Sequence, residues 1–259
     1  MTKRTVFITG GASGIGFGMA NAMVQQGHHV IIADINEQAA QEAAAKLAHD
    51  SGHQGGSASA VAVDVCNAQQ VSSLPEVLGK LSVDVLINNA GIQHVSRLED
   101  FPADKWQQLI NIMLVGPALL TQAFLPSMRA QNFGRIINVG SIHSVVASPY
   151  KSAYVAAKHG LLGFAKTVAL ETGDCDVTIN TLCPAYVKTP LVEQQIAAQA
   201  KENNLTEDEV INKIMLEPMP KKQFISLEEL ADTALFLMSN SARNITGQTM
   251  ILDGGWTAR

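Results

Sequence analysis

Residues Thr9-Gly10-Gly11-Ala12-Ser13-Gly14-Ile15-Gly16 form a glycine-rich segment between a β-branched apolar run at 5–9 and a stretch with helical spacing at 14–26. Glycines permit a tight turn and let backbone N–H groups approach a pyrophosphate, beside the positive end of the following helix. The spacing is G-x3-G-x-G instead of the commoner G-x-G-x-x-G, and a turn that binds nothing is the alternative. Its position directly after a strand favours a dinucleotide-binding turn.

The rest of the chain continues this alternation of short and long segments. Short β-branched runs, typical of buried strands, occur at 5–9, 30–33, 60–65, 83–87, 135–139, 177–182 and 249–252. Longer stretches with helical spacing cover 14–26, 37–49, 68–80, 104–130, 150–171 and 227–239. The alternation predicts an α/β fold, with a doubly wound parallel sheet covered by helices on both faces.

The chain shows no internal division. No Pro-, Ser- or Gly-rich linker interrupts residues 1–259, so we expect a single domain, and the segment GHQGGSAS at 52–59 predicts a surface loop between helix and strand. The stretch 190–222 is rich in Gln, Glu, Ala and Met and has no strand pattern. We interpret it as a small helical lid over a ligand at the strand ends; a plain pair of surface helices is the alternative.

Composition and charge exclude several classes of protein. Hydrophobic residues make up 47% and charged residues 16% of the chain, a globular balance that rules out a largely disordered chain. The formal net charge is −5 at pH 7, and the basic clusters Lys3-Arg4 and Lys221-Lys222 hold only two residues each. Binding to nucleic acid or to an anionic membrane therefore has no electrostatic basis.

Cysteine usage and apolar run lengths indicate the compartment. The three cysteines Cys66, Cys175 and Cys183 are scattered, so we predict neither a disulfide framework nor a metal site. The apolar stretch after Lys3-Arg4 stops at residue 9, which is too short for a signal peptide. No apolar run approaches the ~18 residues of a membrane span. We expect a cytoplasmic protein.

Asp34 follows the second predicted strand and lies 18 residues after Gly16. A carboxylate near this offset accepts hydrogen bonds from both ribose hydroxyls of a dinucleotide and repels a 2′-phosphate. The local sequence Ala33-Asp34-Ile35-Asn36 offers no arginine for such a phosphate, so we predict NAD rather than NADP. The alternative is an ordinary N-cap for the helix that begins near Glu37.

Two further strand ends face the same crevice. Asp64-Val65 ends the third predicted strand, and Asn88-Asn89-Ala90-Gly91 ends the fourth. Asp64 can accept from the adenine amino group, and Asn89, Ala90 and Gly91 offer small side chains and backbone groups to the adenosine ribose. Either segment is equally well read as a plain turn.

Ser141, Tyr154 and Lys158 form a possible catalytic set. The i, i+4 spacing puts Lys158 on the same helix face as Tyr154, one turn on. A nearby ammonium stabilises the phenolate, so we expect a lowered pKa and proton exchange with a substrate hydroxyl. Ser141 can hydrogen-bond the same oxygen as charge develops there. A Tyr and a Lys four residues apart on any helix is the alternative.

Together these motifs resemble the short-chain dehydrogenase/reductase family over essentially the whole chain. Matching segments are 9–16, 88–91, Ser141, Tyr154-Val155-Ala156-Ala157-Lys158, and Pro184 with Thr189. The resemblance implies a Rossmann-type sheet of about seven strands, usually in a homotetramer, with Tyr154 as acid/base and Ser141 orienting the substrate oxygen. It implies that Lys158 holds the nicotinamide ribose. The cofactor residues it implies are Gly10, Ser13, Gly14, Ile15, Gly16, Asp34, Asp64, Val65, Asn89, Ala90, Gly91, Tyr154, Lys158, Pro184, Val187 and Thr189.

Two positions depart from the family pattern. Ala185 follows Pro184 where the family usually has glycine, and a small residue is kept. The family usually places a catalytic Asn seven residues after the Trp of the long helix; counted from Trp106, this position is Met113. Asn111 lies about 200° around a regular helix from Met113 and cannot simply substitute. In the family this Asn supports a water molecule of a proton relay. Here either backbone groups hold that water, or a local distortion of the helix brings another side chain to it.

Further residues resemble those of bacterial D-3-hydroxybutyrate dehydrogenases, a group within the family. These residues are Gln93, His143, Lys151, Gln195 and Trp256. The resemblance implies that the first four hold a substrate carboxylate; a lysine, a histidine and two amides offer convergent donors and a compensating charge. We therefore expect reversible NAD-dependent oxidation of (R)-3-hydroxybutyrate to acetoacetate. Singly, each residue is as well explained as a surface or loop side chain.

Two other functions stay open on the sequence. One is oxidation or reduction of another small hydroxy or oxo compound, such as a sugar, a polyol or an acyl thioester. The other is a module that binds NAD and senses its redox state without turnover. Asp34 and the net negative charge argue against an acyl-carrier substrate, and the set of Ser141, Tyr154 and Lys158 argues against a sensor.

Overall fold

The computed structural model describes residues 2–50 and 55–258. Within them, seven strands form one parallel sheet in the order β3-β2-β1-β4-β5-β6-β7. The strands are β1 Thr5–Thr9, β2 His29–Asp34, β3 Ser57–Ala62, β4 Val85–Asn88, β5 Gly134–Val139, β6 Val177–Pro184 and β7 Thr249–Leu252. The predicted doubly wound α/β fold is confirmed. Six of the seven predicted strand runs lie within two residues of these bounds.

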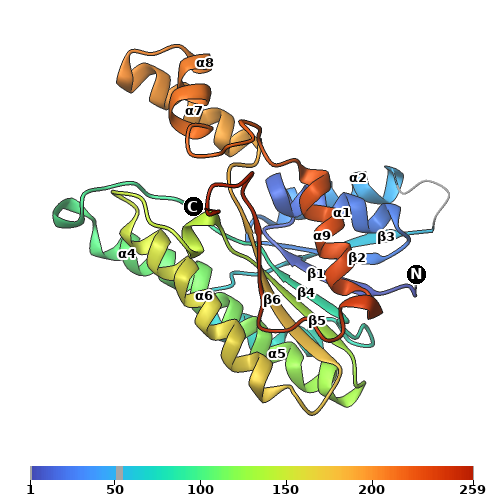
Figure 1. Cartoon of the computed structure of the whole chain (residues 1–259). Helices are drawn as coiled ribbons and strands as arrows, with labels where there is room; N and C mark the ends of the chain where they lie inside the picture. Colours follow the sequence, from blue (N-terminus) through green and yellow to red (C-terminus); the bar gives the residue numbers. More distant parts are fainter. Residues whose placement is uncertain (1, 51–54, 259) are drawn as a thin grey trace.

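Helices cover both faces of the sheet (Figure 1). One face carries α1 Gly14–Gln25, α2 Glu37–Asp50 and α9 Leu227–Met238, and the other carries α3 Ala68–Val77, α5 Gly116–Ala130 and α6 Ser152–Glu171. Strands β5 and β6 are buried along their whole length, and this burial includes polar side chains such as Asn138 and Asn180. The strand order reverses between β1 and β4, so the crevice at their carboxyl ends is where a doubly wound sheet binds its ligand.

The third strand differs from its prediction. We expected strand residues at 60–65, but β3 is Ser57–Ala62 and pairs residue by residue with β2. His29 Nδ1 lies 2.8 Å from Ser57 Oγ, and its Nε2 lies 3.2 Å from Ser59 Oγ. Pairing with β2 therefore outweighs the weak strand propensity of these small residues. Of the loop predicted at 52–59, residues 52–54 lie outside the described residues and 57–59 belong to the strand.

The helix predicted over 104–130 is interrupted. It divides into α4 Ala103–Ile110, a π-helical turn at Asn111–Val115, and α5. Pro117 has no N–H to donate to the carbonyl of residue 113, and the N–H of Gly116 instead bonds the carbonyl of Asn111, five residues back. By length and composition alone the stretch could span a membrane, but most of its large apolar residues pack against the sheet or against α6.

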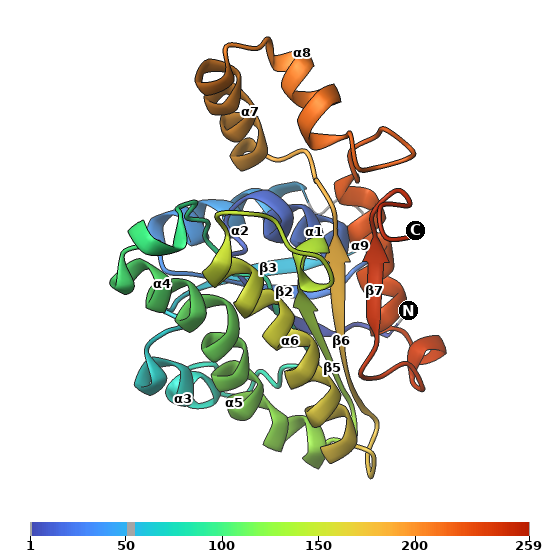
Figure 2. The same ribbon diagram turned by 60° about the vertical axis from the view of Figure 1, so that its left-hand side comes forward.

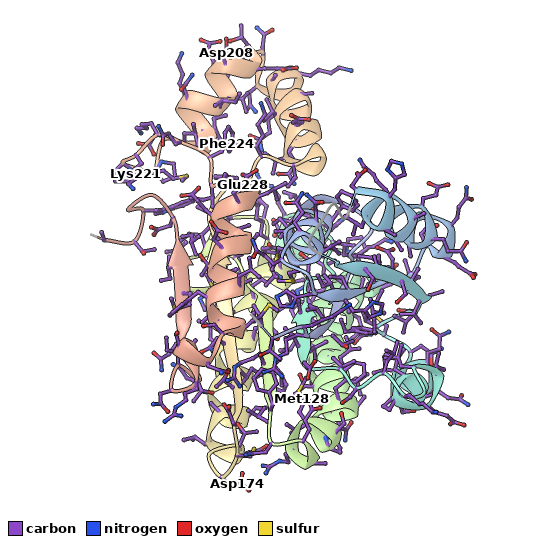
Figure 3. The ribbon with its side chains drawn as sticks, turned by 90° about the vertical axis from the view of Figure 1, so that its right-hand side faces the viewer. Met128, Asp174, Asp208, Lys221, Phe224 and Glu228 are labelled. Carbon is purple, nitrogen blue, oxygen red and sulfur yellow. The ribbon has the colours of Figure 1, made fainter. Side chains whose placement is uncertain are left out.

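Helices α7 Pro190–Asn203 and α8 Glu207–Val210 project beyond the carboxyl ends of the strands (Figure 2). Ile196, Val210 and Met215 form a small apolar cluster of their own, against which Phe224 packs from the returning chain. Figure 3 shows Asp208 at the outer end of this projection and Phe224 near its base. The predicted helical character of 190–222 thus agrees with the structure.

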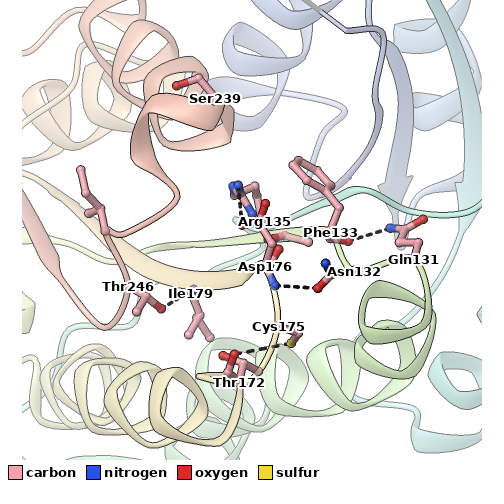
Figure 4. A network of polar contacts seen from close by, with 12 residues as sticks. Gln131, Asn132, Phe133, Arg135, Thr172, Cys175, Asp176, Ile179, Ser239 and Thr246 are labelled. Carbon is pink, nitrogen blue, oxygen red and sulfur yellow. Dashed lines mark hydrogen bonds and ion pairs between the residues drawn. The ribbon is translucent and has the colours of Figure 1, made fainter.

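A polar network ties together the opposite end of the sheet (Figure 4). The Arg135 side chain is fully buried and forms an ion pair with Asp176 over 2.9 Å. Its guanidinium also lies over the ring of Phe133, and Asn132 Oδ1 accepts from the Asp176 N–H at 3.0 Å. This network fixes the start of β5, whose other end carries the candidate catalytic serine.

Candidate active site

A cavity of about 520 Å³ lies at the carboxyl ends of the strands, beneath the projecting helices. Its lining includes most of the predicted site residues: Gly10, Ser13, Gly14, Ile15, Asp34, Asp64, Val65, Asn89, Ala90, Gly91, Gln93, Ser141, His143, Lys151, Tyr154, Lys158, Pro184, Val187, Thr189 and Gln195. Gly16 and Trp256 are not among the lining residues. Gly16 instead packs inside the turn, where a Cβ would stand 2.4 Å from the carbonyl oxygen of Gly10.

The glycine-rich turn is braced from β4. Asn89 Nδ2 donates to the carbonyl oxygens of Thr9 and Gly10, at 2.9 and 3.1 Å. The backbone N–H groups of Asn89 and Ala90 both donate to Thr9 Oγ1 at 3.0 Å. Gly10 has a φ of +60°, and a Cβ there would lie 3.0 Å from the Ala90 backbone. Only glycine fits this close approach without strain, so sequence and packing together fix the shape of the turn.

The turn suits a pyrophosphate. Gly14 also has a positive φ of +55°, and nothing lies within 4 Å of where its Cβ would stand. The Ser13 side chain makes no capping hydrogen bond to α1. The first N–H groups of α1 therefore lack a side-chain cap and face the cavity beside Gly14, which is the arrangement that holds a dinucleotide phosphate.

Asp34 lies at the end of β2 and its carboxylate borders the cavity. Oδ1 accepts from the Asn36 N–H at 3.1 Å and Oδ2 from the Ala12 N–H at 3.4 Å. The alternative role as N-cap of α2 falls to another residue, because Asn36 Oδ1 accepts from the Ala39 N–H. Asp34 is therefore left to line the cavity, with acceptor positions that suit ribose hydroxyls.

Asp64 and Val65 lie after β3 and also border the cavity. Asp64 Oδ1 accepts from the Cys66 N–H at 2.9 Å, and the Asp64 N–H donates to Gln70 Oε1 at 2.9 Å. These bonds hold a compact turn, so the turn and the cavity wall are the same structure. Asp64 can therefore both form a plain turn and face the cofactor, so the two roles that the sequence left open do not exclude each other.

Ser141, Tyr154 and Lys158 meet in the cavity. Ser141 follows β5, and the other two lie one turn apart on α6, as predicted. Lys158 Nζ donates to the carbonyl oxygen of Val139 at 2.6 Å. The ammonium lies 5.6 Å from the centre of the Tyr154 ring. A substrate oxygen beside Ser141 and Tyr154 would thus have a donor and a proton acceptor.

The expected lowering of the Tyr154 pKa is not what the structure gives. Burial raises the pKa of Tyr154, and this outweighs the opposing hydrogen bond from Ser141. Burial also lowers the pKa of Lys158 to about 8, so its ammonium persists at neutral pH and is lost as the pH rises above that value. Lys158 points to a backbone carbonyl, which limits its influence on the phenol oxygen.

The position of the missing family asparagine is filled by a thioether. Met113 is fully buried and lines the cavity from the π-helical turn. A local helix distortion is therefore present, but it does not recruit Asn111, whose Oδ1 accepts from Gln107 Nε2 at 2.8 Å outside the cavity lining.

A second group of polar side chains lies at the substrate end of the cavity. Gln93, Lys151 and Gln195 all line it. Gln93 Oε1 is buried and has no hydrogen-bond partner in the part of the chain that the structure describes. Burial alone lowers the pKa of Lys151, with no acidic side chain acting against it. This end of the cavity therefore offers a partly desolvated cation beside amide groups.

His143 differs from the other predicted carboxylate donors. Its Nδ1 lies 3.4 Å from Ser141 Oγ and its Nε2 lies 2.7 Å from Ser148 Oγ, so both ring nitrogens have hydroxyl partners. Trp256 supports it from behind, with the two rings edge-on at 6.4 Å between centroids. Trp256 also stacks on Tyr186, which lines the cavity.

Tyr186 and Ser148 are site residues that the sequence reasoning did not single out. Tyr186 comes two residues after Pro184, just beyond the carboxyl end of β6, so its position at a strand end is a signal that could have found it. Ser148 lies in a loop with no motif, and only its distance from His143 identifies it.

Comparison with known proteins identifies relatives of the whole chain. A family model described as enoyl-(acyl carrier protein) reductase matches residues 10–257. The chain is 41% identical to an uncharacterized oxidoreductase, YxjF, of Bacillus subtilis and 40% identical to a D-beta-hydroxybutyrate dehydrogenase of Rhizobium meliloti, each over the full length of both chains. A crystal structure of a putative NAD(P)-dependent gluconate 5-dehydrogenase from Beutenbergia cavernae, with bound NADP at low occupancy, superposes with a TM-score of 0.87 at 29% identity, covering 99% of this chain and 97% of the other.

The fold and the matching family and relatives define an oxidoreductase that uses a nicotinamide dinucleotide, NAD or NADP. The chain belongs to the short-chain dehydrogenase/reductase family, as the sequence motifs predicted.

Proposed function

We propose that this protein oxidises (R)-3-hydroxybutyrate to acetoacetate with NAD, reversibly. The observation that carries the proposal is the placement of Gln93, Lys151 and Gln195 in the same cavity as Ser141 and Tyr154. A 3-hydroxy acid has its carboxylate two carbons from the reacting carbinol, so one small molecule would engage both groups. The relatives named as D-beta-hydroxybutyrate dehydrogenases support the same substrate class.

The chain's own residues would bind, orient and take a proton. Lys151 and the two glutamines hold the carboxylate, and the rings of His143 and Trp256 back that part of the wall. Ser141 donates a hydrogen bond to the substrate oxygen while Tyr154 accepts its proton. The bound NAD supplies the hydride acceptor, and the turn at 9–16, Asp34 and Lys158 are the residues that would hold it. Helices α7 and α8 act as the lid of a single NAD-binding domain.

The decisive assay is NADH formation, followed at 340 nm with NAD and each enantiomer of 3-hydroxybutyrate separately. We expect reaction with the D enantiomer alone, which is the (R)-3-hydroxybutyrate named above. Equal rates with both enantiomers, or silence with both, would contradict the proposal. Gluconate and a 3-oxoacyl thioester with NADPH, assayed in parallel, would then identify one of the other small hydroxy or oxo substrates.

Asp34 should make the protein prefer NAD over NADP by at least about tenfold in dissociation constant, because its carboxylate bonds the ribose hydroxyls and repels a 2′-phosphate. Asp34→Ala should weaken NAD binding and reduce the ratio of the NADP dissociation constant to the NAD dissociation constant. Calorimetric titration with each nucleotide measures both constants. Glu37→Gln, which removes a charge on the first turn of α2, is the matched control and should leave the ratio unchanged. Equal affinities in the wild-type protein would refute the role of Asp34.

We also propose a cytoplasmic homotetramer that needs no metal. Support for assembly comes from the edge strand β7 and helix α9, where Ile251 and Phe236 are 40% and 42% exposed. An exposed apolar edge of this kind is a surface that soluble proteins usually cover.

A further inference from the structure

The chain beyond β7 folds into a tight turn around one carboxylate. Asp253 follows the strand directly and is only 9% exposed. Its Oδ1 accepts from the Gly255 N–H at 2.8 Å, and its Oδ2 accepts from both the N–H and the hydroxyl of Thr257 at 2.7 Å. The Trp256 N–H donates to the Asp253 backbone carbonyl at 3.2 Å. Asp253 therefore holds the chain on both sides of Trp256.

The charge of Asp253 is met by this turn. In the part of the chain that the structure describes, no lysine or arginine forms an ion pair with it. Burial acts to raise the pKa of Asp253, but the hydrogen bonds from Thr257 and Gly255 together lower it below its ordinary value. The carboxylate is therefore ionised at neutral pH, and its hydrogen bonds are of the strong, charge-assisted kind.

The turn directs Trp256 toward the wall of the active site. The indole stacks on the Tyr186 ring, with 6.1 Å between centroids and 25° between planes, and lies edge-on to His143. Tyr186 and His143 line the cavity, whereas Trp256 and Asp253 do not. Asp253 therefore reaches the cavity only through the rings that Trp256 supports.

The turn is also fixed from outside by the chain that returns from the lid. Gly254 has a φ of +59°, and a Cβ there would lie 3.1 Å from Met219 Cε. The Lys221 N–H donates to the carbonyl oxygen of Gly254 at 3.1 Å. The turn thus has an inner support, the carboxylate, and an outer support, the returning chain. Loss of the carboxylate would free the side that carries Trp256.

We propose that Asp253 is a positioning residue for substrate binding, because it holds Trp256 against Tyr186 and His143 and so fixes the wall that faces the substrate. The proposal rests on the proposed function, in which these rings lie beside the group that binds the carboxylate. Without Asp253 the indole leaves the stack, and the substrate meets a looser wall beside unchanged catalytic groups. Substrate binding is then weakened more than the chemical step is slowed.

Asp253→Asn is the first test. Asparagine has the same shape but only one acceptor oxygen and no charge, so it cannot hold both sides of the turn. KM for D-3-hydroxybutyrate should rise about tenfold, while kcat and KM for NAD should change by less than about twofold. In a Trp256→Ala background the same substitution should raise KM far less, because the residue through which it acts is gone. Full additivity of the two effects on KM would overturn the proposal.

Thr257→Val is a milder variant, which tests the same turn if Asp253→Asn fails to fold. Valine keeps the side-chain volume and the backbone N–H but removes the hydroxyl that donates to Asp253 Oδ2. KM for D-3-hydroxybutyrate should rise about threefold, and Thr257→Ser, which keeps the hydroxyl, should behave as wild type. A wild-type KM in Thr257→Val, or the same rise in KM in both Thr257 variants, would overturn the proposal.

Asp84→Asn is the matched control. Asp84 is half-buried before β4, at the opposite end of the sheet, and its Oδ2 accepts from the Thr5 N–H at 2.8 Å. The substitution therefore also removes a carboxylate that accepts from backbone, but far from Trp256. It should lower thermal stability and leave KM for D-3-hydroxybutyrate unchanged. A rise in KM as large as that of Asp253→Asn would show general loosening of the fold and would overturn the proposal.

Tryptophan fluorescence gives a readout that needs no turnover. The chain has two tryptophans, so in a Trp106→Phe background the emission reports on Trp256 alone. Asp253→Asn should shift this emission to longer wavelength and increase its quenching by acrylamide, and Asp84→Asn should do neither. An unchanged emission in Asp253→Asn would overturn the proposal even if wild type were inactive on hydroxybutyrate. Inactivity of wild type with both enantiomers, together with the expected shift, would overturn the proposed substrate and support the hold of Asp253 on Trp256.

Discussion

Tyr154→Phe should lose about 10³-fold in kcat, because phenylalanine keeps the ring in the cavity but removes the hydroxyl that exchanges a proton with the substrate. NADH formation with D-3-hydroxybutyrate measures the loss. Ser141 would keep its contact with the substrate oxygen, so KM should change little. The affinity for NAD, measured by calorimetry, should also stay close to that of wild type.

Tyr186→Phe is the control for this variant. Tyr186 lines the same cavity and stacks on Trp256, but no hydrogen bond links it to Ser141 in the described part of the chain. It should retain most of its turnover. If Tyr154→Phe kept more than about a tenth of the wild-type rate, Tyr154 would not be the acid/base, and the NAD-sensing alternative would gain weight.

Lys151→Ala should raise KM for hydroxybutyrate about 100-fold, equivalent to ~3 kcal/mol, because it removes the cation that faces a desolvated carboxylate. The effect should concern binding, so kcat should fall far less than KM rises. Initial rates over a range of hydroxybutyrate concentrations measure both constants. An unchanged KM would remove Lys151 from the substrate site.

Lys151→Met separates charge from packing. Methionine keeps an apolar stem of similar length, so a charge effect predicts a similar rise in KM for both variants. The pKa of Lys151 is lowered by burial, so its ammonium is lost at a lower pH than that of an exposed lysine. In the wild-type protein KM should therefore rise toward alkaline pH, and in Lys151→Met this rise should disappear.

Much of the cavity could be predicted from sequence because its residues follow strand ends. Gly10, Asp34, Asp64 and Asn89 each lie at or just beyond the end of an apolar run, and parallel strands bring their carboxyl ends to one edge. Tyr154 and Lys158 were predictable for a different local reason, the i, i+4 spacing on one helix.

The sequence could not show features that depend on many distant atoms acting together. The pKa of Tyr154 depends on burial by the surrounding chain, which no local spacing reports. His143 was expected to bind substrate, and its hydroxyl partners became visible only through the fold of the loop that carries Ser148. The start of β3 at Ser57 reflects pairing with β2, which overrides local propensity.

The π-helical turn at Asn111–Val115 changes which residues before and after it share one face of the long helix. A regular helix advances about 100° per residue, and a turn that closes over five residues holds one residue more than usual. Side chains before and after it are therefore out of phase by that angle, and a count from Trp106 at α-helical pitch loses register at this point. A one-residue change in chain length inside 111–115 would therefore leave both flanking helices with their faces unchanged.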